Sequence, residues 1–433
     1  MVFRLGGSGS CDPWKARFLV WGIPMDFTDS NEEAEFRSKV RHWLELNAPE
    51  TVKASQGLEG NALKTHAQAW QAAKAAAGFA CISWPEQWGG PGGTLIEQMI
   101  FEEEEAKYGL GFPFFGIGLG MCVPTIMAIG SEATKAKFVG PALRGEQIWC
   151  QLFSEPGAGS DVAASRTRAT QAEAGGAWIV NGQKVWTSGA HYSDFGLLLA
   201  RTNPDVPKHK GLTMFWLDMR SPGVDIRPIH QASGESEFNE VYFADVSIPD
   251  DQRLGEVGKG WNVALITLMN ERLSIGGGFG PNWPEAMQLL HNVPGVGNES
   301  SALAAGGIRE RIADWYVAAE GLKHTRARTL TSLSRGQVPG PEASIGKIVW
   351  ARQMQELATE VLDRLDQHGV LEDHQIQNSA AMFQQSFFMG AAMRIAGGTD
   401  EILRNIIAER VLGLPSDLRS DRDVPFKDIP SGP

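Results

Sequence analysis

The sequence predicts an α+β protein in which a β domain separates two helical domains. Residues 25–147 carry a helical pattern of apolar positions. Residues 148–250 contain short β-like runs separated by glycine and proline clusters, as in an antiparallel barrel. Residues 251–415 return to long helical periods. These three observations predict three domains in the order helical, β, helical.

The first helical domain is expected to begin just after Met25. Asp29 and Ser30 are both candidates for the N-cap of its first helix, because acidic residues occupy the following turn. The run Glu102–Glu105 is interpreted as a solvated helix face. Four consecutive residues on a helix point in different directions, so a shared metal ion is disfavoured.

A long uncharged segment, Tyr108–Ser131, lies within this domain and is long enough to span a bilayer. Six glycines and two prolines interrupt it, which disfavours a lipid-facing helix. We therefore expect buried helices and a loop against a ligand pocket. Small residues at Gly116, Gly118 and Gly120 either leave room for a bulky ligand or allow close helix packing.

The β domain is predicted from runs of β-branched, aromatic and other apolar residues. The expected strands include Ala177–Val180, Gly196–Ala200, Leu212–Leu217 and Glu240–Phe243. The C-terminal helical pattern begins near Gly260 and persists to about Leu412.

The two ends of the chain are expected to lie outside the domains. Residues 1–24 are interpreted as an extension, disordered or artefactual, because Gly6–Ser10 is linker-like. Residues 416–433 are interpreted as a tail.

Composition excludes several classes of protein. The 433 residues are 21% charged and 42% hydrophobic, which is typical of a soluble globular protein. The net charge of −12 disfavours a nucleic-acid partner. The four cysteines are scattered without metal-binding spacing, which favours a reducing compartment. We expect no metal site, no membrane association and a bacterial cytoplasmic location, or the mitochondrial matrix in a eukaryote.

The most informative motif is Gln151–Asp161, which reads QLFSEPGAGSD, with Trp186–Ala190 following it. Gly157 and Gly159 are expected to turn with positive φ and to leave no side chain between the backbone and a ligand. With an indole nearby, this loop suits a flat, polar-edged ring that carries a phosphate tail. An ordinary glycine-rich turn between strands fits the spacing equally well.

Three segments resemble signatures of the acyl-CoA dehydrogenase family. Ser154–Asp161 followed by Lys184–Gly189 resembles its FAD-binding signature. Arg394–Asn405, continuing to Arg410–Pro415, resembles its C-terminal signature, and Ile82–Gly93 resembles a weaker third one. The signatures occur in the family's order and span most of the chain.

The resemblance implies the acyl-CoA dehydrogenase fold, with a β-barrel-like middle domain and a C-terminal four-helix bundle. It implies non-covalent FAD, an acyl-CoA substrate from fatty acid or steroid and other lipid catabolism, and electron transfer flavoprotein as the acceptor. It also implies a tetramer, homomeric or α2β2. The implied cofactor-binding residues are Gln151, Phe153, Ser154, Gly159, Ser160, Trp186, Thr187, Ser188, Thr399 and Glu401.

The C-terminal signature departs from the family at one position. The family's catalytic glutamate usually stands where this chain has Gly397, and glycine cannot abstract a proton. In the family the backbone N–H of this position helps to bind the thioester oxygen, a role that Gly397 keeps.

The resemblance offers Glu271 as the replacement base. Trp261–Ile275 is predicted to be a largely buried helix with one carboxylate, Glu271, followed by the supporting Arg272. This arrangement is similar to the isovaleryl and long-chain branch of the family, whose base lies on this helix. The alternative is a structural Glu271 that pairs with a neighbouring cation.

A second departure concerns the far end of the cofactor. An Arg-x-x-Phe-Gly segment expected near 276–300 is not recognisable, and a Gln-x-x-Gly-Gly segment is altered to Gln367–Leu371. Some bacterial branches of the family, including those acting on steroid side chains, share such losses and form mixed tetramers. Two functions therefore stand: an active dehydrogenase that uses Glu271, and a non-catalytic or half-site subunit of a heteromeric complex. An acyl-CoA oxidase ranks last.

Overall fold

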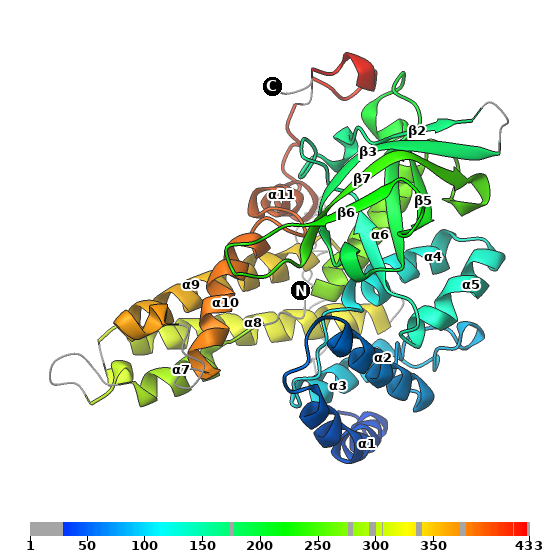
Figure 1. Ribbon diagram of the computed structural model, residues 1–433. Coiled ribbons are helices and arrows are strands. Elements are labelled where there is room, and N and C mark those ends of the chain that lie inside the picture. The colour runs from blue at the N-terminus through cyan, green and yellow to red at the C-terminus, as the bar shows by residue number, and fades with distance from the viewer. Residues whose placement is uncertain are drawn as a thin grey trace, which may run out of the picture.

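The computed structural model describes residues 29–172, 176–275, 280–293, 300–304, 306–334, 340–371, 378–418 and 420–430. Within them the order helical, β, helical is confirmed (Figure 1). Residues 1–28, which include the expected extension, lie outside the described part.

The first domain consists of helices, of which the first three lie at the bottom of Figure 1 and the last two lie to the right, below the sheet. Ser30 caps the first of them in a reciprocal capping box with Glu33, which settles the choice of N-cap. Asp29 instead receives the side chain of Arg37 at 2.6 Å. The helices are α1 (Asn31–Ser55), α2 (Gly60–Ala76), α3 (Leu95–Ala106), α4 (Val123–Ile129) and α5 (Glu132–Leu143).

The run Glu102–Glu105 on α3 is only partly the solvated face that we expected, because Glu102 and Glu103 are exposed but Glu104 is not. Glu104 is buried, and its carboxylate accepts hydrogen bonds from Arg37 at 3.0 Å, Arg41 at 2.9 Å and Lys107. Burial alone would raise the pKa of Glu104, but the three cations lower it to about 2. No cluster of potential metal ligands occurs in the described residues. The prediction failed at Glu104 because two of its three cations, Arg37 and Arg41, lie on α1, far away in sequence.

The uncharged segment Tyr108–Ser131 forms a π-helical turn, Gly118–Cys122, which continues into α4. Pro124 fits within the first turn of α4, where a missing N–H is tolerated. Among the described helices, none is both long and apolar enough to cross a membrane. The expectation of buried helices holds for this segment, since Met121, Cys122, Val123 and Ile126 are all buried.

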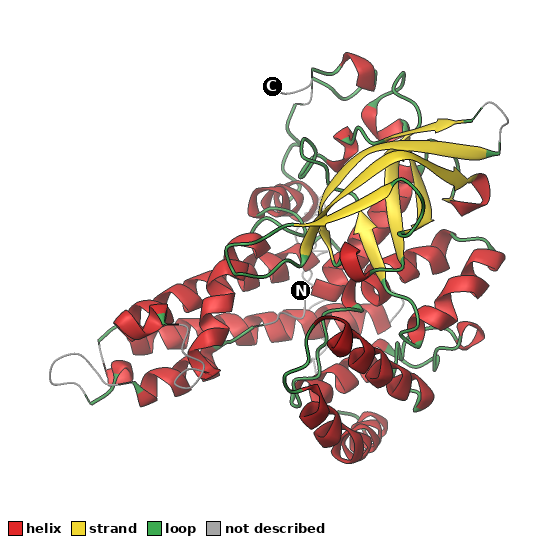
Figure 2. Cartoon of the chain, viewed as in Figure 1, coloured by secondary structure: helices red, strands yellow, loops and turns green. Residues whose placement is uncertain are grey.

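The middle domain is one eight-stranded sheet, drawn in yellow in Figure 2. Its order is β6-β7-β3-β2-β4-β5-β8, and β1 pairs with β4 outside this path. The pairings are antiparallel except that β1 and β2 each run parallel to β4, so the predicted antiparallel domain is a mixed sheet. The strands are β1 (Trp149–Leu152), β2 (Arg168–Gln171), β3 (Ala177–Ser188), β4 (Phe195–Arg201), β5 (Leu212–Asp218), β6 (Val224–Pro228), β7 (Phe238–Pro249) and β8 (Arg253–Leu254).

In its described residues, the last domain is built on four long helices, as expected, with two short ones beside them. In Figure 1, α6 lies beside the sheet, whereas α7 to α10 extend away from it. The helices are α6 (Gly260–Ile275), α7 (Trp283–Asn292), α8 (Ile308–Ser334), α9 (Ala343–Leu365), α10 (Asn378–Met393) and α11 (Asp400–Ile406).

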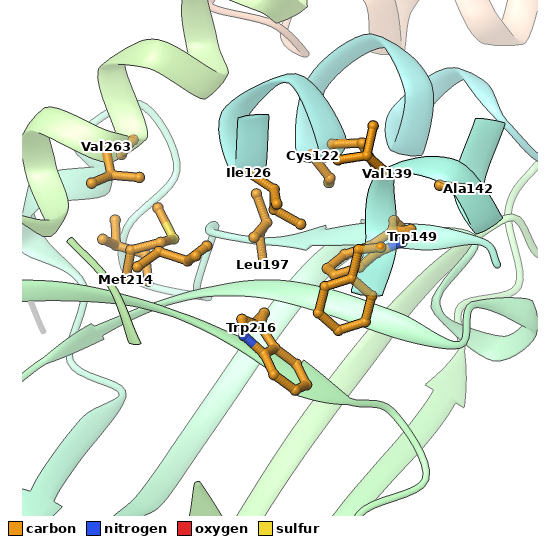
Figure 3. Close-up of a cluster of buried hydrophobic side chains, with 14 of the residues drawn as sticks. Cys122, Ile126, Val139, Ala142, Trp149, Leu197, Met214, Trp216 and Val263 are labelled. Carbon is orange, nitrogen blue, oxygen red and sulfur yellow. The ribbon is translucent and has the colours of Figure 1, made fainter. Parts of the chain in front are cut away.

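One apolar core joins the three domains (Figure 3). Trp149 of β1 and Trp216 of β5 each meet Phe138 of α5 edge to face, at centroid distances of 4.9 and 4.7 Å. Val263 of α6 belongs to the same cluster. Shared burial of apolar surface therefore fixes α6 relative to the sheet and to the first domain.

Candidate functional site

The loop after β1 closes on itself by backbone hydrogen bonds. Glu155 and Ala158 exchange N–H···O bonds of 3.1 and 3.0 Å. Neither Gly157 nor Gly159 has a positive φ, so that part of our expectation is wrong. A Cβ added at either position would meet nothing within 4 Å. These glycines therefore leave the outer surface of the loop open instead of solving a conformational problem.

A buried ion pair supports this loop from beneath. Lys184 of β3 is fully buried and donates to Glu155 and to the Phe153 carbonyl, both at 2.8 Å. Glu155 also accepts the N–H groups of Arg166 at 2.6 Å and Thr167 at 2.9 Å. Burial opposes the ionised form of Glu155, but Lys184 and these N–H groups lower its pKa below the usual value. The carboxylate thus fixes both ends of the loop.

Two polar atoms beside the loop are buried and have no hydrogen-bond partner in the described protein. They are Oε1 of Gln151 on β1 and Oγ1 of Thr187 on β3. A buried acceptor or hydroxyl without a partner is unfavourable by about 1–3 kcal/mol, so such atoms point to a missing ligand or water. Both belong to the residues that the sequence marks for cofactor binding.

Trp186 lies in a bulge that interrupts the pairing of β3 with β7. The pairing with β7 shifts register between Lys184 and Thr187, and Trp186 has φ +59° with 59% of its side chain exposed. A bulky residue in the left-handed region is strained, and such strain concentrates at binding sites. Phe238 meets the indole edge to face at 6.1 Å. The bulge therefore presents an aromatic face to the outside of the sheet.

Gly189 closes the second motif for a steric reason. It has φ +64°, and a Cβ there would lie 2.3 Å from the Tyr192 ring. Of the other predicted binding residues, Ser154 and Ser188 are half-buried and Ser160 is exposed. Phe153 packs its side chain in the core, so its backbone alone remains for a ligand.

The turn before α11 carries the position of the missing glutamate. Gly397 and Gly398 both have positive φ, +64° and +91°. Thr399 caps α11, its hydroxyl accepting the Ile402 N–H at 3.2 Å. The start of the helix and the Thr399 hydroxyl lower the pKa of the exposed Glu401. Thr399 and Glu401 therefore shape the turn, whatever else they bind.

Lys347, near the start of α9, was missed by the sequence analysis. Its ammonium group is buried and donates to the Gly398 carbonyl at 2.7 Å. Burial lowers the pKa of Lys347, while the carboxylates of Asp400 and Glu271 oppose that shift. A lone lysine in the apolar stretch Ala343–Trp350 was the available signal.

Glu271 lies one turn from the C-terminal end of α6 and is half-buried. It acts electrostatically on Lys347 of α9 and on the buried Cys122. Burial chiefly raises the pKa of the Cys122 thiol, and Glu271 adds to this shift. Lys347, which holds the Gly398 carbonyl, therefore lies within electrostatic range of Glu271. The side chain of Arg272 lies outside the described part of the chain.

The glycines proposed to leave room for a ligand differ in their surroundings. A Cβ at Gly118 would lie 3.3 Å from Trp149, which fits close packing. A Cβ at Gly116 would meet nothing within 4 Å. In the altered segment near 276–300, residues 280–293 are described and contain α7, whereas 276–279 and 294–299 lie outside the described part. The altered segment at 367–371 continues a short 3-10 turn, Asp366–Val370, after α9, and the side chain of Gln367 lies outside the described part.

These features fit the flavin that the sequence leads us to expect. Orphaned polar atoms at Gln151 and Thr187, an exposed indole at Trp186 and an open glycine loop provide what a flat, polar-edged ring requires. The residues that would hold it lie on β1, on β3 and in the loop that Glu155 fixes.

Sequence profiles of three domains match successive parts of the chain. They are the N-terminal domain of acyl-CoA dehydrogenases at residues 30–146, the middle domain at 150–246 and the C-terminal domain at 258–412.

Two mycobacterial proteins show extended sequence similarity. Acyl-CoA dehydrogenase IpdE1 of Mycobacterium tuberculosis is 36% identical over 394 residues, covering 89% of this chain and 98% of that protein. Acyl-CoA dehydrogenase FadE34 of the same species is 38% identical over 345 residues, covering 80% of this chain. The matched region spans 46% of FadE34, so the chain corresponds to about half of that longer protein.

A solved structure described as the Tcur3481-Tcur3483 steroid ACAD superposes with a TM-score of 0.75 at 25% identity. The match covers 91% of this chain and 100% of the compared chain.

Proposed function

The chain belongs to the acyl-CoA dehydrogenase family, and we propose that it catalyses the FAD-dependent α,β-dehydrogenation of an acyl-CoA thioester with Glu271 as the base. The observation that carries this assignment is the Lys347 bridge. Lys347 donates to the Gly398 carbonyl and is coupled electrostatically to Glu271, which supports a site that combines the Glu271 carboxylate with the Gly397–Gly398 turn.

Each residue then has a distinct task. Glu271 removes the proton from the α carbon of the acyl chain, and its carboxylate carries that proton afterwards. FAD, when bound, supplies the acceptor for the hydride that leaves the β carbon. The two departures balance as one proton and one hydride, and a double bond forms between the α and β carbons.

The thioester oxygen needs hydrogen-bond donors because negative charge develops there as the α proton leaves. The backbone N–H of Gly397 is suited to this task, since the turn is held open by two glycines with positive φ. Lys347 holds the Gly398 carbonyl at 2.7 Å, one residue further along, and so restrains the turn that carries the Gly397 N–H. Replacing the glutamate side chain by glycine leaves this backbone donor in place.

The cofactor proposal rests on the loop after β1 and on Trp186. Gln151, Thr187, Ser154, Ser160, Gly159 and Ser188 would surround the isoalloxazine edge with polar groups, and Trp186 would cover its face. The exclusion of water by the core between α4 and the sheet would strengthen each of these polar contacts.

The test is the visible spectrum of the purified chain, followed by anaerobic addition of a panel of acyl-CoA thioesters. We expect a yellow protein whose flavin absorbance bleaches with at least one thioester. The panel runs from short straight chains to steroid side-chain thioesters, because the compared solved structure is described as a steroid ACAD.

Three outcomes would redirect the assignment. A colourless protein that takes up no FAD, alone or with a co-purifying subunit, would contradict the cofactor proposal. A flavin that binds but bleaches with no thioester until a second family member is added would favour the half-site subunit. If air reoxidises the reduced flavin at a useful rate and electron transfer flavoprotein does not, the result would favour an oxidase.

A further inference from the structure

The segment that follows α11 returns to the middle domain. Residues 420–430, here termed the strap and drawn in red in Figure 1, lie against the chain between β4 and β5. The Phe426 N–H donates to Val206 at 2.9 Å, and the Lys427 N–H donates to Pro204 at 3.0 Å. The Lys427 side chain also pairs with Asp205 at 2.9 Å. A tail held by backbone bonds on both sides of an aromatic residue is docked, not loose.

An aromatic residue of the strap, Phe426, packs on the buried Arg201. Phe426 is 5% exposed, and its ring centroid lies 3.7 Å from the guanidinium carbon of Arg201. Arg201 in turn donates to the carbonyls of Ala163 and Lys208 at 2.5 Å and of Ser165 at 3.1 Å. Burial lowers the pKa of Arg201 to about 10, while the carboxylates of Glu155 and Asp161 oppose that shift.

A second contact reaches the glycine-rich loop directly. Lys208 is almost fully buried and donates to Asp161, the last residue of the QLFSEPGAGSD motif, at 2.6 Å. It also donates to Asp421 of the strap at 2.5 Å. Burial opposes the charged form of Lys208, but the two carboxylates outweigh it and raise its pKa. The Asp421 carboxylate of the strap therefore helps to keep Lys208 charged, and the charged Lys208 is what binds Asp161.

These contacts all reach residues 161–166, which follow the glycine-rich loop after β1. Residues 161–166 are held from one side by Arg201 and Lys208, and from the other by Glu155, which accepts the Arg166 N–H. Without the strap, Arg201 and Lys208 would each lose a partner that faces them from the outside.

We propose that the strap is a positioning element for the FAD-binding loop, acting through Arg201 and Lys208. The inference rests on the proposed cofactor. Phe426 and Asp421 are the positioning residues, and neither needs to contact the flavin. The strap fixes the loop before the cofactor arrives, which reduces the ordering that binding has to impose.

The experiment uses the full-length chain and two strap variants, with one matched control. Phe426→Ala removes the ring from Arg201, and Asp421→Asn removes one carboxylate from Lys208 without opening the core. Leu418→Ala is the control, because Leu418 is an apolar residue of the same tail that is fully exposed.

The first readout is the FAD dissociation constant of the apoprotein. We expect Phe426→Ala to weaken binding about tenfold or more, equivalent to ~1.4 kcal/mol. Asp421→Asn should weaken it less, and Leu418→Ala should leave it unchanged. The second readout is amide hydrogen exchange of the apoprotein, in which both strap variants should accelerate exchange in residues 151–168.

The two readouts separate this inference from the proposed function. If the unmodified chain binds no FAD, the proposed cofactor fails, and exchange in residues 151–168 still tests the strap. The strap inference is overturned if Phe426→Ala and Asp421→Asn fold, yet leave both the FAD affinity and the exchange of residues 151–168 at the values of Leu418→Ala.

Discussion

Lys347 shows how one buried ammonium group can organise a site built from three parts of the chain. It stands on α9, donates to the carbonyl of Gly398 and is coupled to Glu271 of α6. A buried lysine without such partners would be strongly unfavourable. The residue therefore acts through the turn that it holds and through the charge that it places near Glu271.

Replacing Lys347 by Met should leave FAD in place and impair substrate binding and turnover. The variant loses the bond to Gly398, so the Gly397 N–H is no longer held toward the thioester oxygen. Loss of one positioned donor lowers the rate of catalysis by roughly 10²–10³-fold, and we expect the bleaching rate to fall by up to that factor. The measurement is the rate of flavin bleaching against acyl-CoA concentration.

The matched control for this variant is Lys323→Met, because the Lys323 side chain on α8 is 71% exposed. Its bleaching rate should equal that of the unmodified chain. Equal rates for Lys347→Met and Lys323→Met, with identical FAD content, would show that the Gly398 contact does not position the turn.

Among single residues, the sequence predicted those that lie in a recognisable motif. It missed those that reach the site only through the folding of distant segments. Gly397 and Glu271 were found through resemblance, because each lies in a recognisable segment. Lys347 could not be placed, since its partners are 51 residues ahead on the turn at Gly398 and on another helix. The role of Gly157 and Gly159 was misjudged because a glycine can serve access as well as positive φ.

Among the elements, α1 and α3 are joined by the buried carboxylate of Glu104. Its pKa of about 2 lies below its ordinary value of 4.5 because Arg37, Arg41 and Lys107 surround it. A carboxyl whose pKa is lowered by folding contributes stability that is fully present above the ordinary value. That contribution is lost as the pH falls from about 4.5 toward 2.

Glu104→Gln should therefore destabilise the protein at neutral pH and flatten the acid limb of its stability curve. The loss is expected to be on the order of 1–3 kcal/mol, the range for a buried charged hydrogen-bond partner. Urea unfolding followed by tryptophan fluorescence at several pH values measures both effects. Glu103→Gln on the same helix is the control, since Glu103 is half exposed and, among the described residues, pairs with Arg37 alone. A Glu104→Gln curve that coincides with the control at every pH would refute this role.

The sequence predicted most elements because their patterns are local. The four expected strands lie within β3, β4, β5 and β7, where apolar runs end at glycine and proline clusters. The parallel pairing of β1 with β4 was not predicted, because register between distant strands depends on tertiary packing. The burial of Glu104 within the acidic run on α3 was missed for the same reason, since Arg37 and Arg41, which pair with it, come from α1.

For the whole molecule, the apolar surface of the C-terminal domain indicates assembly. Phe387 and Phe388 on α10 are 43% and 42% exposed, and Ile395 just beyond is 69% exposed. Exposed apolar residues gathered along one region typically mark an interface. We infer a tetramer, homomeric or α2β2, in which this surface is covered by a neighbouring subunit.

Phe388→Asp should lower the molar mass measured by light scattering at micromolar concentration, because an interfacial carboxylate would be desolvated on assembly. Leu46→Asp is the control, since Leu46 is 67% exposed on α1, in the other helical domain. A monomer in the unmodified protein, with or without a co-expressed family member, would count against both versions of the assembly.

The order of the three domains was readable from the chain, but their joint site was not. The core in Figure 3 fixes α6 against the sheet, and this placement is what brings Glu271 toward the rest of the site. No local pattern encodes that contact. Resemblance to a family supplied it as an expectation, and the side chains of the described residues supply its physical basis.

The most direct test of the central claim is the single-turnover bleaching of the flavin by Glu271→Gln. We compare it with the unmodified chain and with Glu310→Gln, which changes an exposed glutamate on α8. Glu271→Gln should keep its FAD and its melting temperature but bleach at least ~10²–10⁴-fold more slowly, because an amide cannot accept the α proton. Glu310→Gln should bleach at the unmodified rate. Bleaching by Glu271→Gln at that same rate would contradict the assignment of Glu271 as the base.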